Sequence, residues 1–167
     1  IKIIGPSAFG YRDADGEPVY TGSPPTVDFA ALRPPRRDLL GHGPYLQSSF
    51  VSVGIQAKRG CALQCVHCSD VFLVGHNIRS RTAKDVVDEM EQMVHEYGVR
   101  QMFFCDQIFN IPVSHSIEIC KEIVARDLKV QWSAWFNEHR KTLPDELMVW
   151  LKRAGCGLLS FSPDHVD

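Results

Sequence analysis

Three cysteines lie close together in one short segment of the chain: Cys61, Cys65 and Cys68. Their spacing is C-x3-C-x2-C, and no matching fourth cysteine follows in the same segment. Thiolates spaced in this way are ligands for iron–sulfur clusters, and a four-iron cluster is normally bound by four of them. Three protein thiolates leave one iron free to bind another molecule. The spacing therefore predicts an iron–sulfur cluster with an open iron.

Two other metal sites fit this segment less well. A structural zinc ion needs four ligands at tetrahedral geometry, and His67 cannot easily join its neighbour Cys68 on one ion. Bacterial ferredoxins use C-x2-C-x2-C with a fourth cysteine soon after. The other cysteines lie far downstream in apolar segments, where a free cysteine is most often a small buried hydrophobe: Cys105, Cys120 and Cys156.

The composition is that of one domain with a real core. The chain has 167 residues, of which 44% are hydrophobic and 23% charged. A net charge of -2 gives no electrostatic footprint for nucleic acid. No apolar run approaches the roughly 20 residues of a membrane span, and no signal peptide is visible. Six cysteines, three of them in one loop, indicate metal chemistry in a reducing compartment, which predicts a cytoplasmic protein.

The chain divides near residue 48. Residues 1–48 contain seven of the ten prolines, which predicts a linker or a wrap rather than a packed domain. Its one clear element is a hairpin, in which Asp13–Gly16 turn the chain between Phe9–Tyr11 and Val19–Tyr20.

Residues 49–167 alternate between strand and helix patterns. Apolar residues at 50, 51, 53 and 55 predict a strand that leads directly into the cysteines. A helix follows from 83 to 97, with Thr82 as its N-cap, Asp85 three residues on and Gly98 at its end. Its apolar face consists of Ala83, Val86, Val87, Met90, Met93, Val94 and Tyr97.

The same plan repeats along the chain. Strands are predicted at 99–105, 130–136 and 157–161, and a second helix at 114–126. The pattern predicts a third helix capped by Thr142, with Pro144 in its first turn and Gly155 at its close. Repeated βα units imply parallel strands, right-handed crossovers, helices on one side, and active residues at the C-terminal strand ends.

The cysteine spacing together with this repeat resembles the radical S-adenosylmethionine (radical SAM) superfamily. In that family the amino and carboxylate groups of SAM chelate the open iron. Electron transfer from the cluster then cleaves SAM to a 5′-deoxyadenosyl radical, which abstracts hydrogen from substrate. The resemblance implies an α/β fold, namely a partial TIM-like (βα) barrel, incomplete in this chain. It also implies a 4Fe-4S cluster, SAM, and a reductant such as flavodoxin or ferredoxin.

Flanking motifs are most similar to the cobalamin-dependent branch: Tyr97-Gly98-Val99, Asp106-Gln107-Ile108-Phe109 and Ala154-Gly155-Cys156. Residues 11–16 and 32–40 are similar to the segment that joins a cobalamin-binding domain to the radical domain. The Asp-x-His-x-x-Gly cobalamin motif is absent, so cobalamin would be bound by a domain outside this chain. The resemblance implies cobalamin-dependent methyl transfer or a related oxidoreductase reaction.

Two alternatives remain beside that reading. One is a cobalamin-independent radical SAM enzyme such as a methylthiotransferase, and the other is a metal-binding fragment without turnover. The barrel of the family has six βα units, whereas three units and a fourth strand are readable here. The chain is therefore expected to be an excerpt of a larger protein, and its sequence does not specify the substrate.

The resemblance also implies further site residues around the metal ligands. Arg59 is adjacent to the cysteines, and its guanidinium could pair with the carboxylate of SAM. His67 occupies a position that is usually aromatic. Asp106 ends the second strand, where a carboxylate contacts SAM or substrate or caps the next turn. Asp164 falls where many relatives have a glutamate that contacts SAM.

Other polar residues have weaker claims to the site. Lys58, Arg79 and Arg81 could offset the negative cluster or form a solvated rim, and Asn137 and Glu138 follow the third strand. The scattered histidines are expected at the surface or in caps: His42, His95, His115 and His139.

Overall fold

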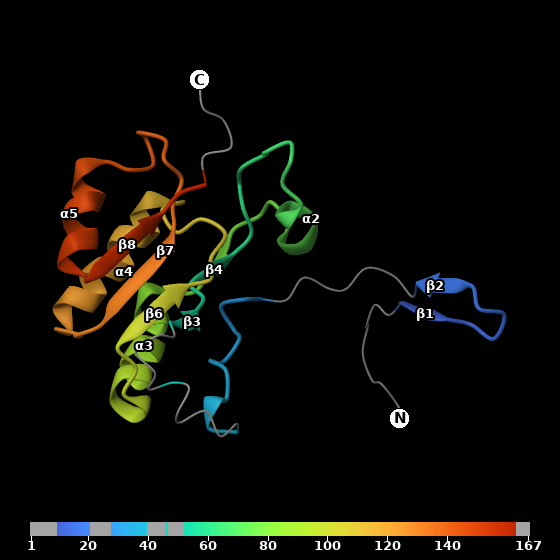
Figure 1. The fold of residues 1–167 in the computed structure, drawn as a ribbon, viewed down its shortest axis with the longest axis horizontal. Coiled ribbons are helices and arrows are strands. Elements are labelled where there is room, and N and C mark those ends of the chain that lie inside the picture. The colour runs from blue at the N-terminus through green and yellow to red at the C-terminus, as the bar shows by residue number, and fades with distance from the viewer. Residues whose placement is uncertain (1–9, 21–27, 40–45, 47–51, 163–167) are drawn as a thin grey trace.

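A computed structural model describes residues 10–20, 28–39, 46 and 52–162 (Figure 1). Its strands are β1 (Gly10–Arg12), β2 (Pro18–Tyr20), β3 (Val53–Ile55), β4 (Lys58–Arg59), β5 (Arg79–Ser80), β6 (Gln101–Phe104), β7 (Gln131–Trp135) and β8 (Cys156–Ser160). Its helices are the 3-10 turn η1 (Arg37–Leu39), α2 (Asp70–Val74), α3 (Ala83–Tyr97), α4 (Val113–Ala125) and α5 (Asp145–Arg153).

The central sheet has four parallel strands in the order β3-β6-β7-β8. Helices α3, α4 and α5 connect successive strands and pack side by side against one face of this sheet (Figure 1). The predicted α/β fold with an open, partial βα barrel is confirmed. Because all four strands run the same way, the segments after β3, β6, β7 and β8 meet at one edge.

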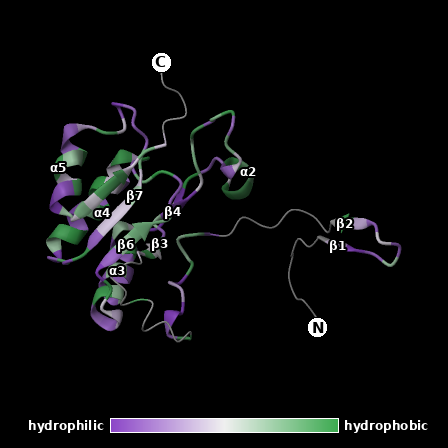
Figure 2. Ribbon diagram, in the orientation of Figure 1, coloured by the Kyte–Doolittle hydropathy of each residue, from purple (hydrophilic) through white to green (hydrophobic). Residues whose placement is uncertain are grey.

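Helix α3 forms where its apolar periodicity predicts. The Thr82 hydroxyl accepts a hydrogen bond from the Asp85 backbone N–H (3.1 Å) and donates one to the Asp85 carboxylate (2.6 Å). This cap supplies a partner for one of the free N–H groups in the first turn. The buried face of the helix contains Val86, Val87, Met90, Met93 and Val94. Figure 2 shows the resulting alternation of hydrophilic and hydrophobic residues along α3 and α5.

Aromatic rings fill the core beneath the C-terminal edge of the sheet. The Phe104 ring lies 4.7 Å from that of Phe109 and 5.0 Å from that of Trp132, measured between centroids. Phe136 continues the cluster, 5.6 Å from Phe109. Edge and tilted contacts of this kind stabilise beyond the area that they bury. The Trp132 indole N–H is also satisfied, since it donates to the Ala154 carbonyl (2.8 Å).

The predicted hairpin is present, with β1 and β2 paired antiparallel around the turn at residues 13–16. The predicted Thr142 cap is wrong. Helix α5 begins at Asp145 with Pro144 as N-cap, and no side chain caps it. The Thr142 hydroxyl instead donates to the His139 carbonyl (2.7 Å), because the chain turns there before the helix begins.

Several other expectations differ in detail. Of the first predicted strand, Phe50 and Val51 lie outside the described residues. Cys120 is buried as expected, but Cys105 is exposed because it follows the last residue of β6. His115 is buried rather than on the surface, since it lies on the inner side of α4. No helix within the described ranges is long and apolar enough to span a membrane.

Candidate functional site: a three-cysteine loop at the edge of the sheet

The three cysteines lie on a loop of residues 60–78, called here the Cys loop. The short strands β4 and β5 pair antiparallel and close its base, with Arg59 opposite Arg79. Within the loop, the Cys61 N–H donates to the Gly75 carbonyl (3.1 Å), and the Arg79 guanidinium donates to the Val74 carbonyl (2.9 Å). These bonds bring the two arms of the loop together. The loop therefore leaves the sheet after β3 and returns before α3.

Gly60 is required where the two arms come closest. Its φ of +100° lies in a region that side chains rarely adopt. A Cβ atom at this position would lie 2.2 Å from the Asn77 carbonyl oxygen, which is far inside van der Waals contact. The glycine directly before Cys61 is thus explained by the backbone geometry of the loop base.

All three cysteines line one cavity of about 460 Å³, called here the Cys cavity. Its opposite wall comes from the segments that follow β6, β7 and β8 at the C-terminal edge of the sheet. The lining residues from the Cys loop are Cys61, Leu63, Cys65, His67, Cys68 and Asp70, and those from the sheet edge are Gln107, Ile108, Trp135, Phe136, Asn137, Glu138 and Ser162.

The donor set of this cavity fits an iron–sulfur cluster. Three thiols from one loop face a cavity that none of the other cysteines line. Burial raises the pKa of the Cys61 thiol, and the neighbouring Cys65 and Cys68 add to the rise. A bound cluster would hold these thiols as thiolates, because a metal deprotonates the thiols that coordinate it. In the described part of the chain, no three Cys, His, Asp or Glu side chains converge on a single metal-ion position.

Gln107 contributes an unsatisfied polar atom at the same cavity. Its Oε1 is buried and has no hydrogen-bond partner among the described residues. Buried polar atoms are almost always paired, so this oxygen can accept a hydrogen bond from a water molecule or from a ligand in the cavity. Sequence reasoning noticed Gln107 only as part of a motif, because a glutamine after a strand has no distinctive signal.

Asn110 holds the segment that forms one wall of the cavity. The sequence did not predict this role. Asn110 is fully buried, and its amide N–H groups donate to the carbonyls of Asn137 and Thr142, both at 2.8 Å. Its Oδ1 accepts from the Asn137 backbone N–H, again at 2.8 Å. Three bonds from one side chain therefore fix the segment that presents Asn137 and Glu138 to the cavity. An asparagine in a loop gives no hint of this role by its sequence alone.

Asp106 lies behind the Cys loop rather than in the cavity. Its Oδ1 accepts from the backbone N–H groups of Ala57 (2.8 Å) and Lys58 (3.2 Å), and its Oδ2 accepts from the Lys58 ammonium (3.0 Å). The Lys58 ammonium also donates to the Phe109 carbonyl (2.8 Å). Burial lowers the pKa of Lys58, and Asp106 partly offsets this. The pair ties the first arm of the loop to the end of β6.

The remaining residues that were predicted to form the site lie in different places. His67 lines the Cys cavity with the cysteines. Arg59 is not among the lining residues: its guanidinium lies over the Phe29 ring (5.1 Å), and its Nε donates to Gln56 (2.9 Å). Arg81 is buried in an ion pair with Glu89. Asp164 lies outside the described residues.

A parallel βα sheet with a three-cysteine loop after its first strand is the arrangement of a radical SAM domain. No model of a known protein family matches the chain. The chain is 26% identical over 127 residues to an uncharacterised methyltransferase of Pyrococcus horikoshii, covering 76% of this chain and 27% of the relative. It is 31% identical over 149 residues to the anaerobic magnesium-protoporphyrin IX monomethyl ester cyclase of Cereibacter sphaeroides, covering 87% and 24%.

Solved structures give the same relationship. The chain matches the radical SAM methyltransferase TsrM of Kitasatospora setae, with cobalamin and a 4Fe-4S cluster bound, at a TM-score of 0.65 and 26% identity. The match covers 70% of this chain and 21% of TsrM. A second TsrM structure, with tryptophan and the SAM analogue aza-SAM bound, matches equally at 0.65. The chain is therefore a relative of the radical SAM methyltransferases, and it spans about a quarter of the length of the curated relatives.

Proposed function

We propose that this chain is the cluster-binding part of a radical SAM enzyme that catalyses methyl transfer. One observation carries the proposal: the three thiols of a C-x3-C-x2-C loop line a single cavity with polar groups from the ends of neighbouring parallel strands. Cys61, Cys65 and Cys68 would hold a 4Fe-4S cluster and leave one iron for SAM. When bound, the cluster supplies the electron that cleaves SAM and starts radical chemistry.

The wall opposite the cysteines would bind and orient SAM. The orphan Oε1 of Gln107 accepts a hydrogen bond, so it suits the ammonium or a hydroxyl of SAM. Glu138 would accept from a second donor, and the Asn110 bonds hold its segment in place. His67 borders the cluster from the loop side. Trp135 and Phe136 supply the apolar side of the cavity wall.

The support for cobalamin in this proposal comes from the relatives, because this chain carries no cobalamin-binding motif. TsrM holds cobalamin, and residues 1–48 lack the Asp-x-His-x-x-Gly motif. We propose that residues 1–48 connect a cobalamin-binding domain to the radical domain that begins at residue 49. The six free cysteines fit a reducing cytoplasm, where flavodoxin or ferredoxin would donate the electron. Titration with hydroxocobalamin should show tight binding by a longer protein that includes the preceding domain and none by this chain.

Anaerobic reconstitution tests the cluster. The wild-type chain should bind about one four-iron cluster, and Cys65→Ala should abolish it. Cys105→Ala is the matched control, since Cys105 is also exposed but does not line the cavity. Full iron and sulfide content in Cys65→Ala would overturn the assignment.

A second experiment tests the open iron and the SAM wall. SAM should change the electron paramagnetic resonance spectrum of the reduced cluster and be cleaved slowly to 5′-deoxyadenosine. Gln107→Leu should weaken SAM binding about tenfold, the effect of one lost hydrogen bond to a charged group. Gln131→Leu, at the opposite end of the sheet, serves as control. An unchanged spectrum at saturating SAM would favour a metal-binding protein without turnover.

A further inference from the structure

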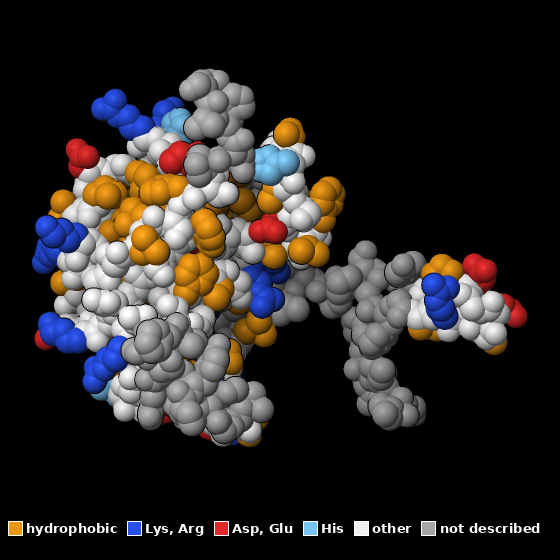
Figure 3. Space-filling view, in the orientation of Figure 1, with side chains coloured by type: hydrophobic (Ala, Val, Ile, Leu, Met, Phe, Trp, Pro, Cys, Tyr) orange, Lys and Arg blue, Asp and Glu red, His pale blue; other side chains and the backbone are white. Residues whose placement is uncertain are grey.

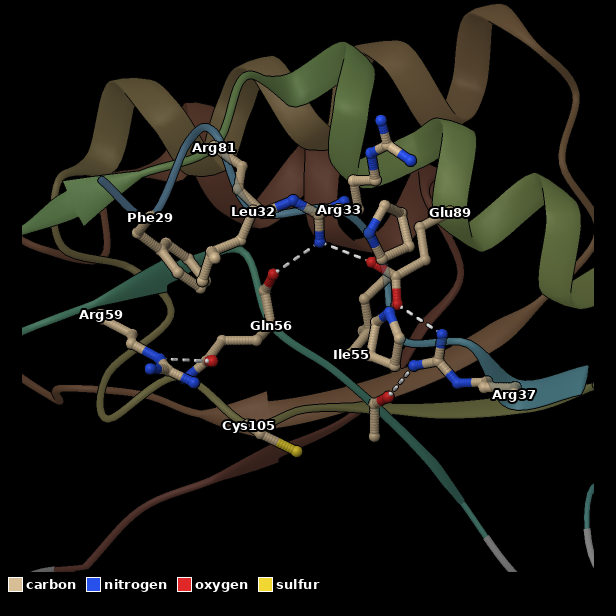
Figure 4. Close-up of a pocket in the computed structure, with 13 residues that line it drawn as sticks. Phe29, Leu32, Arg33, Arg37, Ile55, Gln56, Arg59, Arg81, Glu89 and Cys105 are labelled. Carbon is tan, nitrogen blue, oxygen red and sulfur yellow. Dashed lines mark hydrogen bonds and ion pairs between the residues drawn. The ribbon is translucent and has the colours of Figure 1, made fainter. Parts of the chain in front are cut away.

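Residues 28–39, called here the strap, lie along the free edge of the sheet. A cavity of about 300 Å³ is lined by strap residues together with residues of β3, Arg81 and Glu89. Figure 4 shows Phe29, Leu32, Arg33 and Arg37 of the strap around this cavity. Phe29 is the strap residue that is buried, with 5% of its surface exposed. Pro34 and Pro35 of the strap and Gln56 after β3 line this cavity. Within the described ranges, the hydrogen bonds and ring contacts from the strap to the βα units come from Phe29 and Arg37, near its two ends.

At one end, Arg37 binds the buried carboxylate of Glu89. The Arg37 guanidinium donates to Glu89 Oε1 (2.7 Å) and to the Gly54 carbonyl on the free edge of β3 (3.0 Å). Glu89 lies on α3 with only 2% of its surface exposed. A buried carboxylate needs charged or polar partners, because it has no water to solvate it. Arg37 supplies half of that partnership from outside the βα units.

Arg81 supplies the other half, and it belongs to the returning arm of the Cys loop. Its guanidinium donates to Glu89 Oε2 (2.5 Å) and to the Gln56 carbonyl (3.0 Å). Its backbone N–H donates to the Ala57 carbonyl (2.9 Å), and its carbonyl accepts from His115 Nε2 (2.8 Å). Arg81 is thereby fixed by side chain and backbone directly after β5. Among the described residues, the Glu89 carboxylate is bound both by Arg81 and by Arg37 of the strap.

At its other end the strap contacts the outgoing arm of the loop. The Phe29 ring lies 5.1 Å beneath the Arg59 guanidinium, a cation–π contact. Arg59 is two residues before Cys61, and its Nε is held by Gln56 (2.9 Å). The strap therefore contacts both arms of the loop base, one through Phe29 and the other through Glu89.

We propose that Glu89 is a positioning residue that couples the strap to the Cys loop, so that the strap holds the loop base in the geometry that presents the three thiols. The loop has no apolar core of its own between residues 61 and 80, which makes its orientation depend on its base. Any displacement of the strap is transmitted through Arg37 and Glu89 to Arg81. The part of this proposal that concerns the cluster rests on the proposed function, whereas the coupling itself does not.

The experiment compares Arg37→Met with Arg36→Met in the full chain. The two arginines are sequence neighbours, but the ion pair of Arg36 in the described part of the chain is with the exposed Asp38 (2.6 Å). Without cluster, Arg37→Met should raise amide hydrogen exchange about tenfold in residues 57–61 and 79–82, the effect of one lost charge-assisted bond. Arg36→Met should leave these amides unchanged. After reconstitution, Arg37→Met should also alter the resonance spectrum or midpoint potential of the cluster, which a loss of stability alone would not move.

Coupling through Glu89 also predicts the outcome of a double-mutant experiment. In a Glu89→Gln background, adding Arg37→Met should produce little further change in loop exchange, because the link is already broken. If Glu89→Gln does not fold, the two arginine variants still decide the matter. Loop exchange in Arg37→Met equal to that in Arg36→Met would overturn the coupling. Absence of a cluster in the wild-type chain, with the exchange effect intact, would overturn the proposed function instead.

Discussion

The βα scaffold buries apolar side chains on β3, β6 and β7 and on all three of its long helices, whereas no residue from 61 to 80 is buried. The scaffold is therefore stabilised by hydrophobic burial, which scales with the area removed from water. The Cys loop cannot be stabilised in this way, because it buries no side chain between residues 61 and 80. Its position is fixed by polar groups at its base, where Lys58 and Arg81 are each buried against a carboxylate. These buried ion pairs therefore connect the segment that carries the three cysteines to the scaffold.

Three apolar residues of the loop are exposed to solvent. Val66, Phe72 and Leu73 are at least 81% exposed. Figure 2 shows this hydrophobic stretch on α2, and Figure 3 shows orange side chains over the same part of the surface. Hydrophobic residues in this region consequently add little to the stability of the chain.

The sharpest test of this contrast replaces one phenylalanine in each region. Phe104→Ala removes a fully buried ring from the aromatic core and should lower the free energy of unfolding by about 3–5 kcal/mol. Phe72→Ala removes a ring that is 88% exposed and should change it by less than about 0.5 kcal/mol. Urea unfolding followed by circular dichroism measures both. Similar losses in the two variants would show that the loop is packed against the scaffold.

Breaking the ionic base of the loop should have the next largest effect. Asp106→Ala leaves Lys58 buried without its carboxylate, which should cost about 3 kcal/mol. Deprotonation of Lys58 limits this cost, since burial already lowers the pKa of that ammonium. Because the pKa of Lys58 is lower in the folded variant than in the unfolded chain, Lys58 in the unfolded chain keeps its proton at pH values where the folded variant has lost it. The stability deficit should therefore shrink as pH rises toward about 10.4, the ordinary lysine value.

The control for Asp106 is Asp38→Ala, which removes an exposed carboxylate paired with Arg36. Surface pairs of this kind contribute little, so no measurable change is expected. Urea titrations at several pH values would compare the variants. A pH-independent deficit in Asp106→Ala would mean that Lys58 gains solvent when its partner is lost.

Substitution of two glycines, one at the base of the loop and one at the end of α3, compares the effect of backbone strain in the loop with its effect in the scaffold. Gly98→Ala at the end of α3 meets no atom within 4 Å, so only its left-handed φ of +68° should cost about 1 kcal/mol. Gly60→Ala adds a clash with the Asn77 carbonyl and should open the loop base. We expect Gly60→Ala to lose most of its reconstituted iron and Gly98→Ala to keep it. Equal iron content in the two variants would contradict the tight loop base.

Much of the fold could be predicted because its signals are local and periodic. The helix at 83–97, its Thr82 cap and the hairpin at residues 13–16 follow from neighbouring residues, and the structure matches them. The cysteine spacing likewise indicated a shared site, and the three side chains line one cavity. Thr142 failed because two capping-type positions, a turn and a helix start, lie within a few residues of each other.

The unpredicted part of the site consists of contacts between distant residues. Asp106 reaches back to Lys58 across 48 positions, and Asn110 binds Asn137 across 27. Both side chains are polar and follow strands, where an exposed and a buried role have the same sequence pattern. Arg59 lies away from the cavity, with its guanidinium over the ring of Phe29, thirty positions earlier, and its Nε bonded to Gln56. The contact with Phe29 depends on how the strap packs, which has no local sequence signal.

The smallest expected effect concerns His115, which links helix α4 to the loop base. Its Nε2 donates to the Arg81 carbonyl (2.8 Å), while its Nδ1 is buried without a partner among the described residues. Burial lowers the pKa of His115, and the nearby Lys58 ammonium adds to this, while the hydrogen bond to Arg81 and the Asp106 and Glu118 carboxylates oppose it. The folded chain thus binds fewer protons than the unfolded chain below the ordinary histidine pKa of about 6.5. The stabilising contribution of His115 should be complete above that pH and should fall as the pH drops toward the lower pKa of the folded state.

Thermal unfolding between pH 5 and pH 7 should show this loss of stability in the wild type and in His95→Gln, whose ring is exposed on α3. His115→Gln should reduce the slope, because the buried titrating ring is gone. An equal slope in His115→Gln would assign the acid sensitivity to other groups.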